Sequence, residues 1–187
     1  MVPDQKSAES DDTSMARIAS RDAAAFRAVV EAHGSRAHRI GYRMLADAAE
    51  AEDIAQETML RLWDHAGRWR PGGPGIAAWV TRVASNLCLD RIRRRRFTSD
   101  AAIPERIDES PLADAAIEAD QARARTIAAV QALPDRQRAA IVLTYYEELS
   151  NISASAALKM NLKAFESLLL RARATLKRTL LDAGEAA

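Results

Sequence analysis

The segment RIRRRRFTSD places arginine at positions 91 and 93–96, and Phe97 follows this arginine run. A guanidinium group binds phosphate oxygens through parallel N–H donors, so a run of this kind suits a polyanion. One or two cations would be enough to complement the dipole at the C-terminal end of a helix, and five neighbouring like charges repel one another. The run therefore predicts contact with nucleic-acid phosphates, and a solvated helix end is the alternative.

Aromatic side chains near the arginine run are a second candidate for nucleic-acid chemistry. Trp69, Trp79 and Phe97 belong to the same part of the chain as the arginines. Exposed aromatic rings beside arginines form a platform on which unpaired bases stack. Trp79 also falls on the apolar stripe of its expected helix, IAAWVTRVASNLCLDRIRRRRF, residues 76–97, where a core position is the alternative.

The stretch LADAAEAEDIAQETMLRLWDHAGRW, residues 45–69, predicts a helix that begins with a capping box at Asp47 and Glu50. At about 100° per residue, one face of this helix collects small and apolar side chains. The opposite face carries the set that we call the docking face, which consists of Asp53, Gln56, Glu57 and Leu60, with Trp63 at its edge. Acids around an apolar centre suit a protein partner with a basic rim, and a solvated helix surface is the alternative.

The C-terminal part of the sequence has the pattern of a helix-turn-helix. Pro134 suits a helix start, and a short helix over 150–160 is followed by a turn near Asn161 and a longer basic helix. A short helix, a tight turn and a second helix that enters the major groove are typical of this motif. The cations that would hold phosphates around it are Lys163, Arg171, Arg173, Lys177 and Arg178.

Composition predicts an all-α protein, because alanine is abundant, there are only 7 glycines and 6 prolines, and β-branched runs are absent. We expect two small helical domains joined by a flexible acidic linker. The segment from 100 to 120 has seven acids against one arginine, and Pro104 and Pro111 interrupt it. The expected boundaries are a disordered N-terminus at 1–15, a first domain at 16–98, the linker at 99–120 and a helix-turn-helix domain at 121–187.

Several classes of protein are excluded by the same sequence. The net charge is +1, so nucleic-acid binding must come from local charge. The single cysteine, Cys88, is expected to be buried, and His33, His38 and His65 are too scattered for a metal site. We find no grouping typical of catalysis, so we expect no enzyme activity, metal or cofactor. Because no signal peptide or membrane-length apolar stretch is evident, we expect a cytoplasmic protein without membrane insertion.

Taken together, these segments resemble the extracytoplasmic-function (ECF) sigma factors, the smallest σ70-type bacterial initiation factors. AEDIAQETMLRLW resembles their region 2.2, which binds the β′ clamp helices of RNA polymerase. AAWVTRVASNLCLDRIRRRRF is similar to regions 2.3 and 2.4, which melt and read the −10 element. LPDRQRAAIVLTYYEELSNISASAALKMNLKAFESLLLRARATLKRTL is similar to region 4, whose helix-turn-helix reads the −35 element.

The resemblance implies partners and roles for individual residues. It implies core RNA polymerase, bound at the β′ clamp helices and the β flap, promoter DNA, an anti-sigma factor that blocks the polymerase faces, and a role in stress response. It also implies that a −10 base flips into a pocket formed by the Trp69–Gly75 loop and Asn86. Stacking and edge hydrogen bonds would offset the few kcal/mol that flipping costs, and an N-cap role for Asn86 is the alternative. The implied −10 residues are Trp69, Asn86, Arg91, Arg93, Arg94, Arg95 and Arg96.

The second helix of the helix-turn-helix departs from the family pattern. The family usually has basic residues where this chain has Glu166 and Leu168, which leaves Lys163, Ser167 and Arg171 as the expected −35 readers. Glu166 would accept a hydrogen bond from a cytosine amino group. The family also has a glycine in the turn where this chain has Lys159. Asn161, a residue type that tolerates left-handed backbone, is expected to substitute for it in part.

Two other functional classes fit parts of the pattern. A helix-turn-helix repressor would bind duplex DNA alone, and it would need neither the docking face nor a melting domain. A sigma-mimicking interaction protein would hold a partner without reading DNA, and its arginine run would be dispensable. Binding to core polymerase together with promoter-dependent transcription separates these classes.

Overall fold

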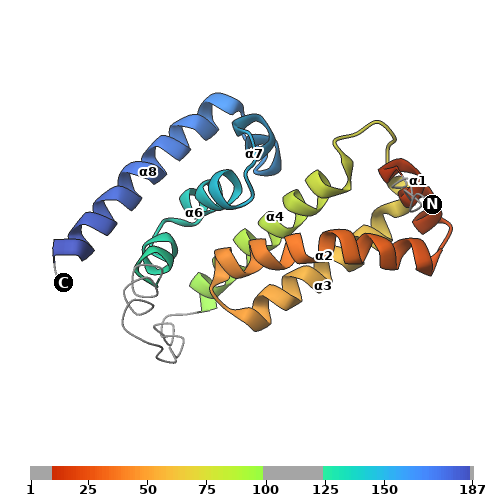
Figure 1. The fold of residues 1–187 in the computed structure, drawn as a ribbon, viewed down its shortest axis with the longest axis horizontal. Helices are drawn as coiled ribbons and strands as arrows, with labels where there is room; N and C mark the ends of the chain where they lie inside the picture. Colours follow the sequence, from red (N-terminus) through yellow and green to blue (C-terminus); the bar gives the residue numbers. More distant parts are fainter. Residues whose placement is uncertain (1–9, 99–123, 186–187) are drawn as a thin grey trace, which may run out of the picture.

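The computed structural model describes residues 10–98 and 124–185 of the chain. Every regular element in these two ranges is a helix (Figure 1), which confirms the expected all-α class. The expected acidic linker at 99–120 lies outside the described residues. None of the described helices is long and apolar enough to cross a membrane.

The N-terminal part, residues 10–98, is built around three long helices that pack against one another. Asp22 and Asp47 cap two of these helices, since their carboxylates accept hydrogen bonds from backbone N–H groups of the first turn. Glu50 does not complete the expected capping box, because its carboxylate pairs with arginines instead. The elements are α1 (Asp11–Ala19), α2 (Ala23–Leu45), α3 (Ala48–His65), the 3-10 helix η1 (Ala66–Arg68) and α4 (Gly75–Thr98).

Helix α1 corrects the prediction that residues 1–15 are disordered. The chain is helical from Asp11, while residues 1–9 lie outside the described part. Ser10 caps the helix by accepting a hydrogen bond from the backbone N–H of Thr13. Met15 and Ile18, three positions apart, are fully buried in the core. Two apolar side chains on one turn are enough to dock a helix whose other residues are polar or alanine.

The C-terminal part, residues 124–185, has the expected helix-turn-helix. Phe165 at its centre is fully buried. The turn differs from the expectation, because Lys159 itself adopts the left-handed backbone with φ 52°. Asn161 instead caps the second helix, since its Oδ1 accepts from the backbone N–H of Ala164 at 2.8 Å. The elements are a helix at 124–131, α6 (Asp135–Ile141), the π-helix η2 (Val142–Tyr146), α7 (Asn151–Ala157) and α8 (Leu162–Glu185).

The two parts pack directly against each other, with α6 and α7 against α4 and η2 against α2 (Figure 1). The carboxylate of Glu147 lies 3.3 Å from Arg36 and 3.4 Å from Arg39 on α2. Arg138 donates to the backbone carbonyl of Met44 at 2.6 Å, which satisfies an acceptor at the C-terminal end of α2. These contacts join polar groups of one part to polar groups of the other, so the described arrangement is a closed one.

Candidate nucleic-acid interface and docking face

The two faces of α3 lie as the helical period predicts. Ile54, Thr58 and Leu62 are buried, whereas Asp53 and Gln56 are exposed on the other side. Leu60 is 62% exposed, as are other large apolar side chains such as Leu170 at 67%, but Leu60 stands among the acids of the docking face. The docking face therefore presents an isolated apolar side chain among polar groups.

Trp63, at the edge of the docking face, is half-buried and packed within its own domain. Its ring lies 4.9 Å from the ring of Phe26 in an edge-on arrangement. The Arg21 guanidinium lies 5.1 Å from the centre of the same ring. Such contacts hold the indole in place, so it can present one rigid edge to a partner.

The arginine run forms the C-terminal end of α4, and part of it is neutralised by α3. Arg91 lies 3.6 Å from Asp53 and 3.7 Å from Glu50, and Arg95 lies 2.5 Å from Glu50. Glu50 and Asp53 lie in the first half of α3. They pair with Arg91 and Arg95, which are one helical turn apart on α4. The ion pairs explain how the fold accommodates adjacent cations, and they link Asp53 of the docking face to the run.

The remaining arginines of the run point in other directions. Arg93 pairs with Asp90 at 3.4 Å, and Arg96 pairs with Asp135 of the C-terminal part at 2.8 Å. The side chains of Arg93, Arg94 and Arg96 are exposed, whereas that of Phe97 lies outside the description. An exposed ion pair such as Arg93–Asp90 contributes only about 0–1 kcal/mol, so a phosphate can replace this acid at little cost. Phosphate binding by the run stays a prediction.

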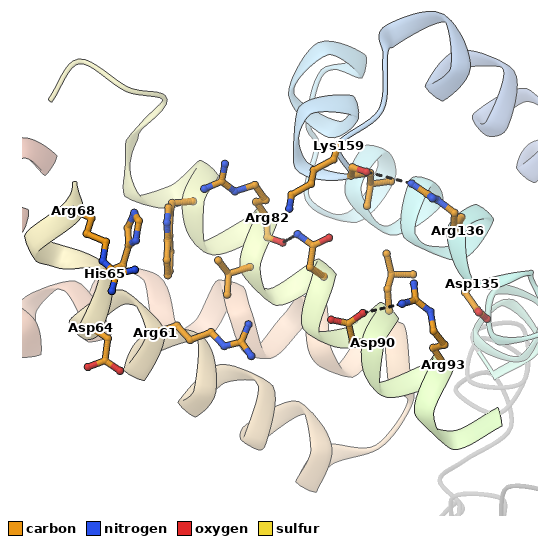
Figure 2. Close-up of a pocket in the computed structure, with 15 residues that line it drawn as sticks. Arg61, Asp64, His65, Arg68, Arg82, Asp90, Arg93, Asp135, Arg136 and Lys159 are labelled. Carbon is orange, nitrogen blue, oxygen red and sulfur yellow. Dashed lines mark hydrogen bonds and ion pairs between the residues drawn. The ribbon is translucent and has the colours of Figure 1, made fainter. Parts of the chain in front are cut away.

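A basic cleft of about 930 Å³ lies between α3, α4 and the C-terminal part (Figure 2). Asn86 lines this cleft from the middle of α4, which excludes the N-cap alternative for its side chain. Its Nδ2 donates to the carbonyl of Arg82 at 2.8 Å. Lys159 extends from the α7–α8 turn towards α4. The acids that line the cleft are Asp64, Asp90 and Asp135, and the cations are Arg61, Arg68, Arg82, Arg93, Arg136 and Lys159.

The tryptophans do not form the exposed platform that the sequence suggested. Trp79 is only 8% exposed, which bears out its core alternative. Its ring stacks on His65 at 5.4 Å. Burial, followed by the charges of Arg68 and Arg82, lowers the pKa of His65, so this imidazole is neutral at pH 7. Trp69 is half-buried, and its indole N–H donates to Asp12 at 2.8 Å.

The loop at 69–75 and Asn86 are separate parts of the candidate −10 site. Arg68 lines the basic cleft with Asn86, whereas residues 69–75 do not. Ile76 and Asn86 are about 15 Å apart along α4, at about 1.5 Å per residue. The spacing along α4 favours contacts of the loop and of Asn86 with different nucleotides, and the shared pocket for one flipped base stays a prediction.

The expected −35 readers lie on one exposed side of α8. Lys163, Ser167 and Arg171 follow one another at intervals of four residues, and all three are exposed. Glu166 is also exposed, so it can face DNA. Leu168 is only 7% exposed and belongs to the core, so it is not a departure on the reading surface.

An apolar groove on the C-terminal part was missed by the sequence analysis. It has a volume of about 460 Å³ and lies between the 124–131 helix, η2 and the second half of α8. Arg173 and Lys177 lie at its edge. The sequence signal for this groove was the pair Leu176 and Leu180, which are four residues apart on α8. The apolar and aromatic side chains that line the groove are Val130, Ile141, Tyr145, Tyr146, Leu176, Leu180 and Leu181.

Cys88 has the structural role that its sequence context suggests. It is fully buried, and burial raises its pKa to about 12, so the thiol is unreactive at neutral pH. Within the described residues, no group of three or more His, Cys, Asp or Glu side chains could hold a metal ion.

Known families and proteins match both parts of the chain. The family described as Sigma-70 region 2 matches residues 29–98, and that described as Sigma-70, region 4 matches residues 123–176. The ECF RNA polymerase sigma factor SigK of Mycobacterium sp. (strain KMS) is 31% identical over 163 residues, which are 83% of each chain. SigE of Mycolicibacterium smegmatis is 33% identical over 80% of this chain, which spans 59% of the length of SigE.

Two solved structures have the same arrangement of helices. The structure of CnrH in complex with the cytosolic domain of CnrY matches with a TM-score of 0.69 at 27% identity, over 94% of this chain and 99% of that one. The sigma factor RpoE in complex with the anti-sigma factor NepR, from Bartonella quintana, matches with a TM-score of 0.65 at 21% identity, over 83% of this chain and 96% of that one. The second match concerns the fold alone.

Proposed function

The chain belongs to the extracytoplasmic-function sigma factors of the sigma-70 family, which are transcription initiation factors, and from this premise we propose how its residues bind polymerase and promoter DNA. Residues 10–98 are called region 2 below, and residues 124–185 are called region 4. Region 2 docks on core RNA polymerase and reads the −10 element. Region 4 reads the −35 element.

The exposure of Leu60 is the observation that carries the proposal. Leu60 is 62% exposed on α3 between the acids of the docking face. An apolar side chain with acids around it matches the apolar core and polar rim of a protein–protein interface. A repressor that binds duplex DNA by itself has no use for this surface. We assign Asp53, Gln56, Glu57, Leu60 and Trp63 to the contact with the β′ clamp helices.

The region 2 wall of the basic cleft supplies the proposed −10 interface. Its four cations, Arg61, Arg68, Arg82 and Arg93, outnumber its two acids, Asp64 and Asp90, so it attracts the phosphates of a single strand. Asn86 lies among these cations, and a side-chain amide can form two hydrogen bonds with a base edge. Arg91 and Arg93 to Arg96 extend the basic surface along α4. Trp69 belongs to the loop that meets a neighbouring nucleotide.

Region 4 carries two further proposed contacts. Lys163, Ser167 and Arg171 face the −35 element from the exposed side of α8. We propose that the apolar groove of region 4 binds an apolar segment of the polymerase β flap. The groove has apolar walls with cations at its rim, which suits an apolar segment that carries acids at its edges.

Promoter binding requires the closed arrangement to open. The −35 and −10 elements are about 25 base pairs apart, which is roughly 85 Å at about 3.4 Å per base pair. Lys159 of the helix-turn-helix and Asn86 line one cleft, so the two reading surfaces lie much closer together than that. We therefore assign the closed form to the free protein and an extended form to the polymerase complex. On the same family premise, we propose that the protein acts in the cytoplasm, under the control of an anti-sigma factor.

Binding to purified core RNA polymerase tests this function. We expect the full-length chain to form a stoichiometric complex, and we expect Leu60→Asp to weaken it at least tenfold. Leu170→Asp is the control, because Leu170 is similarly exposed but lies on α8. Equal binding by wild type and Leu60→Asp would remove the docking assignment.

A further inference from the structure

Helix α1 makes specific contacts with the loop at 69–75, although it precedes the part of the chain that matches region 2. We propose that Asp11 and Asp12 are positioning residues, which fix the shape of this loop and thereby the choice of a −10 base. The positioning of the loop by Asp11 and Asp12 does not depend on the proposed function, whereas the effect on the choice of a −10 base rests on that function. No other role for α1 has emerged from the docking face or the basic cleft.

Asp12 holds the beginning of the loop with both carboxylate oxygens. Its Oδ1 accepts from the indole Nε1 of Trp69 at 2.8 Å, and its Oδ2 accepts from the backbone N–H of Gly72 at 3.0 Å. The hydrogen bond from Trp69, followed by that from Gly72, lowers the pKa of Asp12, so the carboxylate is charged at neutral pH. One side chain thus fixes both a ring and a backbone group of the same loop.

Asp11 holds the end of the loop. Its Oδ2 accepts from the backbone N–H of Ile76 at 2.8 Å, which satisfies a donor in the first turn of α4. Gly75 adopts φ 86°, and a Cβ atom at this position would lie 2.6 Å from Oδ2 of Asp11. Only glycine therefore allows the carboxylate to approach so closely. The close approach and the hydrogen bond are two separate signs that Asp11 is seated against the loop.

The two carboxylates are mounted on a fixed element. Met15 and Ile18 anchor α1 in the core of region 2, and both are fully buried. The acids follow the helix cap at Ser10, so they occupy the turn of α1 that faces the loop. Because α1 is anchored, movement of the loop would require these hydrogen bonds to break.

The test has one readout on the free protein and one on the promoter complex. In a ¹H–¹⁵N spectrum, the indole N–H of Trp69 should shift upfield in Asp12→Ala, while those of Trp63 and Trp79 stay in place. In the holoenzyme, Asp12→Ala should reduce discrimination at one −10 base by roughly tenfold, which is within the range of one well-formed base contact. Affinity for core polymerase should not change, since the docking face is on α3.

Conservative variants separate positioning from a general loss of structure. Asp11→Asn should keep base preference, because its single bond needs only one acceptor oxygen, whereas Asp11→Ala should lose it. Asp12→Asn should lose part of the base preference, because the asparagine amide has one acceptor oxygen, whereas Asp12 uses two. Gly75→Ala should resemble Asp11→Ala, because the methyl group displaces the carboxylate. Glu31→Ala on the exposed surface of α2 is the control.

The outcomes separate this inference from the proposed function. An unchanged Trp69 signal in Asp12→Ala would overturn the positioning contact. A shifted signal with unchanged base preference would overturn its role in promoter reading. Failure of the wild-type chain to bind core polymerase would contradict the proposed function, while the spectrum of the free protein would still decide whether Asp12 holds the loop.

Discussion

Arg36 and Glu147, which are 111 residues apart in the chain, form an ion pair at 3.3 Å in which the Glu147 side chain is only 1% exposed. Arg39 lies 3.4 Å from the same carboxylate. A buried carboxylate needs such partners, because leaving it uncompensated costs several kcal/mol. Glu147 belongs to region 4 and both arginines belong to α2, so this pair holds the closed form together.

We expect Glu147→Gln to favour the open form. The glutamine keeps the shape of the side chain but loses the charge, and hydrogen bonds to charged groups contribute about 1.5–3 kcal/mol. Small-angle X-ray scattering of the free protein should show a larger radius of gyration. Glu148→Gln is the matched control, because Glu148 is the exposed neighbour. If Glu147→Gln has the same radius of gyration as the wild type and the control, Glu147 does not hold the regions together.

The docking face can be tested by charge reversal. Asp53→Arg with Glu57→Arg should weaken core polymerase binding by about thirtyfold or more, as expected for a hot spot worth about 2 kcal/mol. Helix content should stay the same, because the pairs with Arg91 and Arg61 are at the surface. Titration of labelled polymerase measures the affinity, with Glu31→Arg as the control. Retained affinity in the double variant would leave the face as a solvated surface.

Phosphate contacts and base contacts should differ in their response to salt. Arg93→Ala with Arg94→Ala should weaken holoenzyme binding to every −10 sequence alike. The slope of log affinity against log salt should become shallower by about 0.7–0.9 per lost contact. Asn86→Ala should keep the slope and relax preference at one base. An unchanged slope in the arginine variant would favour the alternative for Arg93 and Arg94, which is a solvated helix end.

Leu168 and Leu170 form a matched pair on α8. Leu168 is 7% exposed and Leu170 is 67% exposed. Leu168→Ala should lower the free energy of unfolding by about 2–4 kcal/mol, because it leaves a cavity in the core. Leu170→Ala should change it by less than about 0.5 kcal/mol. Thermal melts measure both, and equal effects would contradict the assignment of Leu168 to the core.

Helical periodicity predicted those features that depend on one element alone. The buried and exposed faces of α3 follow from spacing, because each position along a helix turns by a fixed angle. The cap at Asp47 was also predicted, since a short acidic side chain reaches the nearby N–H groups. The family resemblance supplied the order of the regions, and it agrees with the matched families.

Contacts between distant segments were not predictable in this way. Asp12 and Trp69 are 57 residues apart, and no spacing rule links them. Helix α1 was missed because two apolar residues in a short polar segment give a weak periodic signal. The arginine run shows the same limit, since its charge was evident but its partners on α3 were not. The packing of region 4 against region 2 depends on Glu147, whose burial arises only in the folded chain.

Run-off transcription by core polymerase reconstituted with this chain tests the central claim most directly. On fragments of genomic DNA, we predict discrete transcripts that require the chain and that disappear when Asp53 and Glu57 are both changed to arginine. Tight binding of the free chain to duplex DNA, without any polymerase-dependent transcript, would instead indicate a repressor. Binding to core polymerase without promoter-dependent transcripts would indicate a sigma mimic, and either result would contradict the account.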